Sequence, residues 1–294
     1  MYYLWKQKIE YKLFHIFNYT YYKMSFPKII SVEGNIGAGK TTIIEQLEKQ
    51  YKDIKSVLVV REPVNVWESI KDSDGESILA KYYKNPEKYA FSFQVMAFVT
   101  RLSLLRNLIK ENPECKLIIC ERSLEADRKI FAKMLYDDKM IDEINYKIYM
   151  NFYNEYKNDF KLNGLVYIHT EEDVCYNRVH KRNRKGEDVV PLEYLKKCKE
   201  YHQDWLINKK NILVINANAD VTYNIEDPDD KGMCWLRLIK NYIDKIMDDE
   251  GVCEYYEYSE EEKDDEQREE DNNNEDFGLN YYLLKSIKSF IWKF

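Results

Sequence analysis

The chain contains 294 residues with a formal net charge of −7, a length that suits one large α/β domain with appended segments. Residues 248–276 hold 16 acidic and 2 basic residues, a net charge of −14, so the rest of the chain carries +7. Because no basic run interleaves with aromatic residues and no apolar run approaches the ~20 residues that cross a bilayer, we expect no nucleic-acid partner and no transmembrane segment.

Six cysteines are scattered along the chain without a C-x-x-C pair, and no secretory apolar region opens the sequence. This pattern favours a reducing compartment, and we expect a cytoplasmic protein.

Residues 1–26 are aromatic and basic, and their apolar side chains recur at a rough helical spacing. Arginine and serine, which organelle-targeting segments need, are nearly missing from this stretch. We expect a loosely packed extension, and adhesion to a membrane surface is the main alternative.

From Pro27 onward, short apolar runs alternate with longer amphipathic ones. The apolar runs predict β-strands at residues 28–34, 56–60, 116–120, 165–169 and 211–217. Helical spacing fills residues 41–51, 67–111, most of the stretch up to 160, a short segment ending at 178, 191–206 and 234–246. Strands that alternate with helices predict an α/β domain over residues 27–247, with a parallel β-sheet flanked by α-helices.

Residues 248–278 are too acidic and polar to bury a core, and we expect them to form a disordered tail. Residues 279–294 regain amphipathic character. This last segment could dock on the domain, on a partner or on a membrane surface, and the sequence does not decide among the three.

The stretch that begins at Gly34 reads G-x-x-x-x-G-K-T and lies between a predicted strand and a predicted helix. In this context the glycines let backbone N–H groups turn toward phosphate oxygens, the lysine reaches the β and γ phosphates, and the threonine hydroxyl holds Mg²⁺. We predict that ATP or another nucleoside triphosphate is bound by Gly34, Asn35, Ile36, Gly37, Ala38, Gly39, Lys40, Thr41 and Thr42.

Charged residues follow the next two predicted strands: Glu62 after the second, and Glu121 and Arg122 after the third. Ligands of such sheets bind beyond the carboxyl ends of the strands, so we expect these residues over the same crevice as Lys40. One carboxylate can accept a proton from an attacking hydroxyl, another can hold Mg²⁺, and the arginine can neutralise a migrating phosphoryl group. Each acid alone would be read as a solvated loop residue, but their joint position favours catalysis.

A basic cluster lies at the end of one predicted helix and in the loop that follows, with arginines at Arg178, Arg182 and Arg184. Such a cluster is typical of a lid that closes on phosphates. The alternative is a solvated helix end that is favoured by the helix dipole.

The stretches EGNIGAGKTT, EPVNVW, YKNPEKYAFSFQ, ERS, DRKIF and RNRKGEDVVPLEYL together make the chain resemble the deoxynucleoside kinases of the deoxycytidine and deoxyguanosine kinase family. The resemblance runs from about residue 28 to residue 245 and leaves out both termini. It implies a P-loop kinase fold with an arginine-rich lid, transfer of the γ-phosphate of ATP to the 5′-hydroxyl of a deoxynucleoside for nucleotide salvage, Mg²⁺ as cofactor and a homodimer.

The same resemblance implies roles for single residues. Glu62 would be the general base, Glu121 the Mg²⁺ carboxylate, and Arg122 the arginine beside the 5′-oxygen. Gln94 would make paired hydrogen bonds to the base. The remaining matches are the base-pocket walls Trp67, Phe93 and Phe131, the sugar-binding Tyr83 and Glu187, and the ATP-binding Arg178, Arg182, Arg184, Asp220 and Val221.

Arg101 and Asp127 match a pair found in relatives that act on deoxycytidine or purine deoxynucleosides, so the resemblance leans toward these substrates and away from thymidine. A purely structural buried pair is the alternative. Tyr82 stands where relatives have a thinner methionine and is expected to narrow the pocket. Arg61, directly before Glu62, would either lower the pKa of Glu62, the expected general base, or point to solvent.

Two other functions fit parts of the sequence. A nucleoside monophosphate kinase such as thymidylate kinase also has a P-loop and a Glu-Pro pair, but it must seat a dianionic phosphate where Glu62 points. A carboxylate there is repulsive unless Arg61 offsets it. A catalytically inactive nucleotide-binding interaction module is the second alternative, although every expected catalytic residue is present.

Overall fold

The computed structural model describes residues 26–184, 186–187, 189–207, 209–248 and 256–258. The predicted N-terminal extension, apart from its last residue, lies outside this range. The same holds for the C-terminal segment 279–294 and for most of the predicted acidic tail. All of the described residues belong to one unit, Met1–Tyr258.

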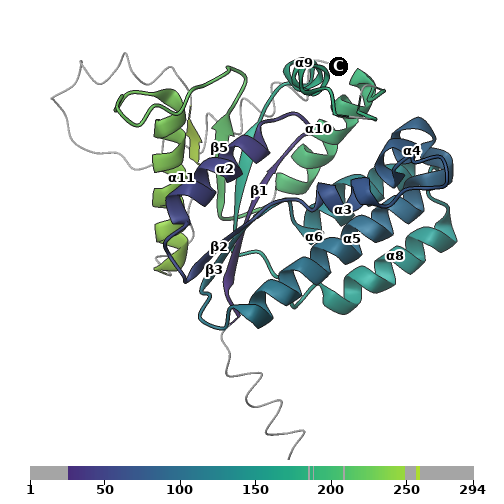
Figure 1. The fold of residues 1–294 in the computed structure, drawn as a ribbon, viewed down its shortest axis with the longest axis horizontal. Coiled ribbons are helices and arrows are strands. Elements are labelled where there is room, and N and C mark those ends of the chain that lie inside the picture. The colour runs from purple at the N-terminus through teal and green to yellow at the C-terminus, as the bar shows by residue number, and fades with distance from the viewer. Residues whose placement is uncertain (1–25, 185, 188, 208, 249–255, 259–294) are drawn as a thin grey trace, which may run out of the picture. The chain divides into compact units, whose positions relative to one another are not determined.

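The described strands form a single parallel sheet in the order β2-β3-β1-β4-β5-β6 (Figure 1). Their bounds are β1 (Lys28–Gly34), β2 (Val57–Val60), β3 (Leu117–Glu121), β4 (Gly164–His169), β5 (Ile212–Asn216) and β6 (Tyr256–Tyr258). The five predicted strands are confirmed to within one residue at each end. Glu121, the last residue of β3, is in register with Val32, and Gly34, the last residue of β1, is in register with Ile168 of β4, so the carboxyl ends of β1, β3 and β4 lie at one edge of the sheet.

The sixth strand, β6, lies where we expected a disordered tail, and at these three residues the expectation does not hold. Tyr256–Tyr258 pair in parallel with Leu213–Ile215 of β5. Strand pairing is made by main-chain groups and needs no apolar side chains, which is why the acidic composition gave no sign of it.

The helices alternate with the strands as expected, but two predicted helical stretches are divided. Residues 67–111 hold two complete helices and the end of a third. The last two are divided at Asn85, whose side chain accepts from the Lys88 amide, so that it ends one helix and caps the next, with Pro86 in the first turn. The full set is α2 (Lys40–Tyr51), α3 (Val64–Ser69), α4 (Ile78–Lys84), α5 (Pro86–Glu111), α6 (Leu124–Ala126), the π-helix η1 (Asp127–Ala132), α7 (Lys133–Asp137), α8 (Glu143–Tyr156), α9 (Glu172–Arg182), α10 (Leu192–Leu206) and α11 (Lys231–Met247).

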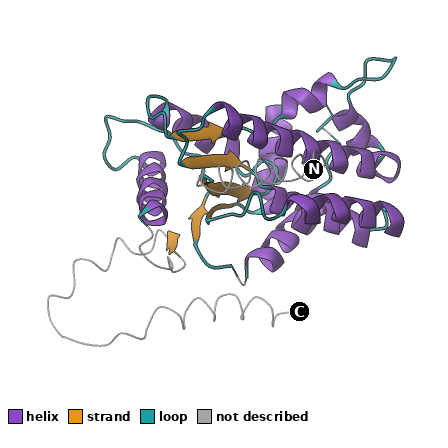
Figure 2. Ribbon diagram, turned by 90° about the horizontal axis from the view of Figure 1, so that it is seen from below, coloured by secondary structure: helices purple, strands orange, loops and turns teal. Residues whose placement is uncertain are grey.

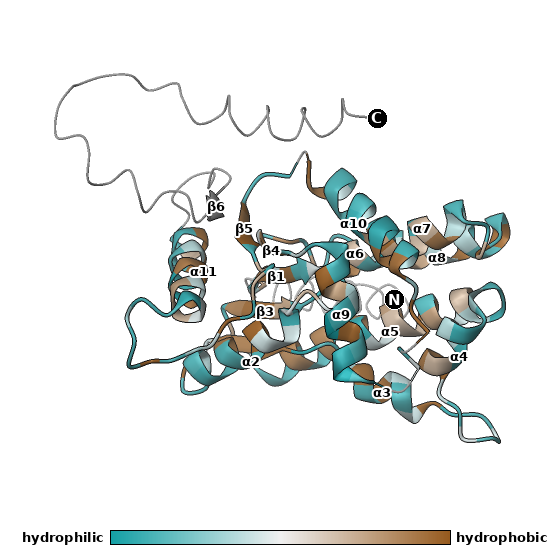
Figure 3. Ribbon diagram, turned by 90° about the horizontal axis from the view of Figure 1, so that it is seen from above, coloured by the Kyte–Doolittle hydropathy of each residue, from teal (hydrophilic) through white to brown (hydrophobic). Residues whose placement is uncertain are grey.

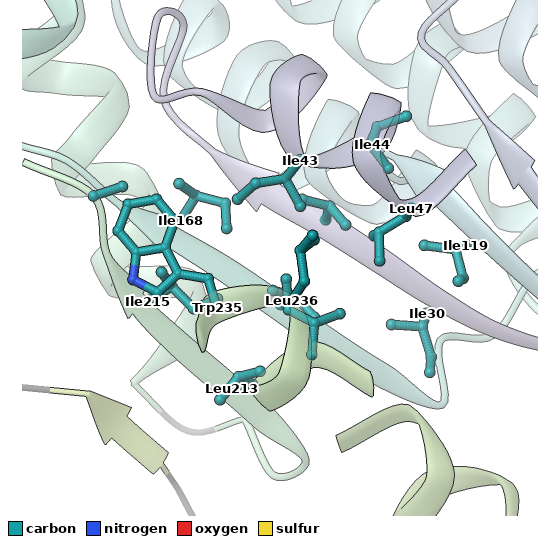
Figure 4. Packing of buried hydrophobic residues seen from close by; sticks show 14 of the residues in the cluster. Ile30, Ile43, Ile44, Leu47, Ile119, Ile168, Leu213, Ile215, Trp235 and Leu236 are labelled. Carbon is teal, nitrogen blue, oxygen red and sulfur yellow. The ribbon is translucent and has the colours of Figure 1, made fainter. Parts of the chain in front are cut away.

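Helices cover both faces of the sheet (Figure 2). On one face, α2 and α11 bury Ile43, Leu47 and Trp235 against Ile168 and other strand residues (Figure 4). The neighbouring positions of the strands point to the opposite face, where they pack against α5, α8, η1 and α10. Burial on both faces explains the continuous apolar runs of the strands.

Hydrophobic residues therefore concentrate along the central strands, whereas α9 is largely hydrophilic (Figure 3). Within the described part of the chain, no helix combines the length and the apolarity that a membrane crossing requires.

Candidate active site

The loop after β1 is built to receive an anion. Gly37 and Gly39 adopt positive φ angles of 82° and 101°, and a Cβ added to Gly37 would lie 2.5 Å from the carbonyl oxygen of Cys175. α2 then starts at Lys40 with no side-chain cap and with no acidic residue in its first turn. The first N–H groups of α2 are therefore available to phosphate oxygens.

Lys40 is almost fully buried and donates to the Asn35 carbonyl oxygen at 2.8 Å. Burial, reinforced by the charge of Arg122, lowers the pKa of Lys40 to about 8. Because burial disfavours the charged form of Lys40, an anion that binds beside the ammonium group would stabilise that form.

Thr41 and Glu121, which the sequence assigns to Mg²⁺, are in direct contact. The Thr41 hydroxyl donates to Glu121 Oε1 at 2.6 Å. Both side chains offer the oxygen ligands that Mg²⁺ prefers, and this ion commonly takes one or two protein oxygens together with phosphates and water. No group of three histidine, cysteine, aspartate or glutamate side chains forms another metal site among the described residues.

Glu62 lies between two buried arginines. Arg101 Nη2 donates to Glu62 Oε1 at 2.9 Å, and Arg122 Nε lies 3.3 Å from the same oxygen. Burial by itself would raise the pKa of Glu62, but Arg122, Arg101 and Lys40 outweigh it and lower the pKa to about 2. Glu62 is consequently an ionised, cation-held carboxylate at the edge of the sheet.

Arg122 has a strained backbone, with a φ angle of 64° in the left-handed region. Its guanidinium lies over the Phe131 ring, 4.5 Å from the centroid. Phe131 and Asp127 both come from η1, a π-helix, which is a rare element that frequently occurs at functional sites. Phe131 contacts Arg122, and Asp127, four residues earlier in η1, contacts Arg101.

An aromatic pocket adjoins these charges. Trp67 meets Phe93 edge-on at 5.4 Å, and Tyr82 stacks on Phe93 at 4.6 Å with an interplanar angle of 6°. Gln94 is buried, and its side-chain oxygen has no hydrogen-bond partner among the described residues. An unpaired buried amide oxygen beside aromatic walls is suited to a polar ligand group such as a base edge.

At one end of this pocket, Arg101 donates to both oxygens of Asp127, from Nε at 2.9 Å and from Nη2 at 3.2 Å. Arg101 also lies 5.8 Å from the Trp67 ring centroid. The same arginine therefore touches the pocket wall, Asp127 and Glu62.

The lid arginines are held by carboxylates. Arg182 and Arg184 donate to the two oxygens of buried Glu187, at 2.5 and 3.1 Å. Arg178 pairs with Asp220 at 2.9 Å and donates to the Ala217 carbonyl oxygen at 2.8 Å. Three cations thus line the rim in geometries that a polyphosphate could engage.

One cavity of about 1230 Å³ joins the P-loop, the aromatic pocket and the lid, and it is large enough for two substrates. Every site residue predicted from the sequence lines it except Gly34 and Asn35. These two support the loop instead: Gly34 accepts from Arg122 Nη2 at 3.2 Å through its carbonyl oxygen, and the Asn35 side chain donates to the Leu195 carbonyl oxygen at 2.8 Å.

Residues 30–240 match the family model described as deoxynucleoside kinase. The chain belongs to the deoxynucleoside kinase family.

Curated relatives agree with this result. A probable deoxycytidine kinase of fowlpox virus is 36% identical over 202 residues, which cover 66% of this chain and 80% of the relative. The deoxycytidine kinase of Bos taurus is 31% identical over 240 residues (74% and 91%). A mitochondrial deoxyguanosine kinase of Xenopus laevis is 28% identical over 220 residues (66% and 82%). This chain is accordingly an enzyme, a deoxynucleoside kinase that serves nucleotide salvage and uses a nucleotide as phosphate donor.

Arg61, which precedes Glu62 in the kinase, does not act on it. The Arg61 guanidinium bonds to Glu45 at 3.0 Å and to Glu48, and its side chain is 47% exposed. Of the two alternatives for Arg61, the structure favours the solvent-facing one, and Arg101 and Arg122 are the cations that lower the pKa of Glu62.

Sequence reasoning missed one residue that lines the cavity of the kinase and one that lies buried next to the P-loop. Tyr194 of α10 lines the cavity, and its hydroxyl lies 2.9 Å from that of Tyr82. Glu33, at the end of β1, is completely buried. The only signal for Glu33 was a lone acid in an otherwise apolar strand run.

Proposed function

We propose that the kinase transfers the γ-phosphoryl group of ATP, or of another nucleoside triphosphate, in line to the 5′-hydroxyl of a deoxynucleoside. Glu62 accepts the hydroxyl proton, and Arg122 together with Lys40 stabilises the charge that develops on the phosphoryl group. The observation that carries this proposal is the meeting of Glu62, Arg122 and the P-loop in one cavity whose far end is an aromatic pocket.

A pKa of about 2 leaves Glu62 fully ionised at neutral pH, so that it can always accept a proton, although its affinity for the proton is low. This suits a loose transition state, in which little proton transfer is needed before the phosphoryl group moves. If a bound nucleoside draws Arg101 toward the nucleobase, Glu62 loses one of the two arginines that hold it, and the affinity of Glu62 for a proton rises.

We propose Thr41 and Glu121 as the protein ligands of Mg²⁺. When bound, the ion neutralises charge on the β and γ phosphates. The two side-chain oxygens lie 2.6 Å apart and next to the start of α2. Lys40 and the lid arginines Arg182 and Arg184 complete the phosphate-binding surface from the other side.

For the nucleoside, we propose that Gln94 and the Arg101–Asp127 pair bind the base between Trp67, Phe93 and Phe131. Tyr83 and Glu187 bind the sugar, and Asp220 and Val221 lie at the donor nucleotide. Relatives named for deoxycytidine and deoxyguanosine support a preference for deoxycytidine or a purine deoxynucleoside. Tyr82, which stacks on Phe93, reduces the depth of the pocket. A shallower pocket favours cytosine over the larger purine bases.

The deciding experiment is transfer from radiolabelled ATP with Mg²⁺ to the four deoxynucleosides, their 5′-monophosphates and the matching ribonucleosides. Turnover of deoxycytidine or purine deoxynucleosides, with little on thymidine, is the expected result. Turnover of monophosphates alone would favour a monophosphate kinase. Binding of ATP without turnover of any acceptor would favour a nucleotide-binding module.

We further propose a homodimer formed through α8 and α5, which lie side by side (Figure 1). Ile144, Ile148 and Phe152 recur every four residues on α8 and are 73%, 39% and 43% exposed, and Val99 of α5 is 45% exposed. A stripe of this kind can pack on its own copy about a two-fold axis. Light scattering should find a dimer for the wild type and for the control Lys147→Ala, and a monomer for Ile148→Glu. A monomeric wild type at micromolar concentration would contradict the proposal.

A cytoplasmic location remains our proposal. It is supported by the cysteines of the described region, which are all free, four of them buried. A fluorescent fusion would test it.

A further inference from the structure

Glu33 is a buried acidic residue without an assigned role. Burial raises the pKa of its carboxyl group, and the charge of Arg122 together with hydrogen bonds from Ser123 and Ser31 opposes that shift. Glu33 is 0% exposed at the end of β1, directly before Gly34, and it does not line the cavity. A buried carboxylate is unfavourable unless it is paired or hydrogen-bonded, so its retention within a strand calls for specific partners.

The first set of partners lies on Oε1. This oxygen accepts from the Ser31 hydroxyl at 2.6 Å and from the Ser123 amide at 2.9 Å. Ser123 directly follows Arg122, whose φ angle of 64° turns the chain sharply, and the Arg122 amide donates to the Val32 carbonyl oxygen at 3.0 Å. Main-chain groups on both sides of the strained residue are thus fastened to the end of β1.

The second partner faces Oε2. This oxygen has no hydrogen-bond partner in the described part of the chain, and neither has Arg122 Nη1, which lies 4.0 Å away. The other guanidinium nitrogens of Arg122 are occupied: Nε faces Glu62 at 3.3 Å and Nη2 donates to the Gly34 carbonyl oxygen at 3.2 Å. The carboxyl group of Glu33, which does not line the cavity, is therefore the ion-pair partner that faces Nη1.

We propose that Glu33 is a positioning residue, which holds the Arg122 turn through Oε1 and the Arg122 guanidinium through Oε2 so that the arginine is preorganised for the migrating phosphoryl group. This inference rests on the proposed role of Arg122. Preorganised charge acts mainly in the transition state, so its loss lowers kcat more than it raises KM.

Glu33→Gln is the sharpest perturbation, because glutamine keeps the shape and can still accept from the Ser123 amide while the charge facing Nη1 is lost. We expect kcat to fall roughly 10- to 100-fold, the loss that is typical when the partner that orients a metal ligand is removed, with KM for ATP and for deoxynucleoside changed less than about threefold. The matched control is Ser31→Ala, which removes a hydrogen bond to the same carboxylate without changing its charge. Its kcat should stay within about twofold.

A double-mutant cycle with Arg122→Met separates positioning from general structural support. If Glu33 acts through Arg122, Glu33→Gln lowers kcat in the wild-type background and has no further effect in the Arg122→Met background. An equal loss in both backgrounds, or an unchanged kcat in Glu33→Gln, would overturn the inference. Glu33→Asp, which keeps the charge, should retain more activity than Glu33→Gln and serves if the glutamine variant does not fold.

A readout that is independent of turnover distinguishes failure of this inference from failure of the proposed function. In the full chain labelled with ¹⁵N-arginine, the restrained Arg122 side chain should give resolved guanidinium signals, identified by their loss in Arg122→Met. Glu33→Gln should collapse them through faster rotation, and unchanged signals would overturn the inference. Absence of turnover in the wild type would instead count against the proposed function.

Discussion

Replacing Glu62 with glutamine tests the proposed mechanism most directly. Glutamine fills the same space between Arg101 and Arg122 but cannot accept the proton of the 5′-hydroxyl. It also removes the negative charge that offsets two buried cations at 2.9 and 3.3 Å. A positioned general base contributes roughly 10²–10⁴-fold to the rate, so we expect kcat to fall by about 10³-fold, or about 4 kcal/mol.

The assay is steady-state phosphoryl transfer with deoxycytidine or a purine deoxynucleoside, with binding of the nucleoside measured separately by calorimetry. Nucleoside affinity should stay within a few-fold, because the aromatic walls and Gln94 are untouched. Glu45→Gln, which removes an exposed carboxylate outside the cavity, is the matched control and should behave like the wild type. Near-normal turnover of Glu62→Gln, or a loss confined to KM, would refute the assignment of the base.

Three further predictions follow from the same contacts. Asp127→Ala should lower the free energy of unfolding by about 3 kcal/mol, because Arg101 loses its bidentate partner. Adding Arg101→Met to the same chain should recover part of this stability and raise the turnover of thymidine relative to that of deoxycytidine. Urea unfolding measures the stability, and acceptor assays measure the turnover. The pKa of Glu62 is lowered from 4.5 to about 2, so this carboxylate should contribute about 3 kcal/mol to the free energy of unfolding. The contribution should be complete above pH 4.5 and be lost as the pH falls toward 2. If Glu62→Gln has the same dependence of stability on acid pH as the wild type, this prediction is contradicted. Chains ending at residue 258 and at residue 248 should both keep full activity. Only the shorter chain, which lacks β6, should melt at a lower temperature. Loss of activity in a folded truncated chain would mean that the tail supports the site.

The domain fold was predictable from local patterns. Five apolar strand runs and the amphipathic stretches between them were enough to indicate a parallel sheet covered on both faces, because most side chains of a strand that is buried on both faces are apolar. The glycine pattern before Lys40 likewise indicated a phosphate-binding loop, since only glycine adopts the required backbone angles without strain. Local chemistry did not reveal β6, which pairs through its main chain alone.

The sequence by itself therefore indicated candidate residues for the chemistry, because Glu62, Glu121 and Arg122 lie at or just after the carboxyl ends of strands, and parallel pairing places these ends together. Only the tertiary structure decided how these groups act on one another. It set Arg101 against Glu62 across 39 positions of sequence, turned Arg61 away toward Glu45, and placed Glu33 behind Arg122. Charges respond to distance and burial, and neither quantity can be read from sequence spacing, so pKa values and ion pairs emerge only when the strands and helices are assembled.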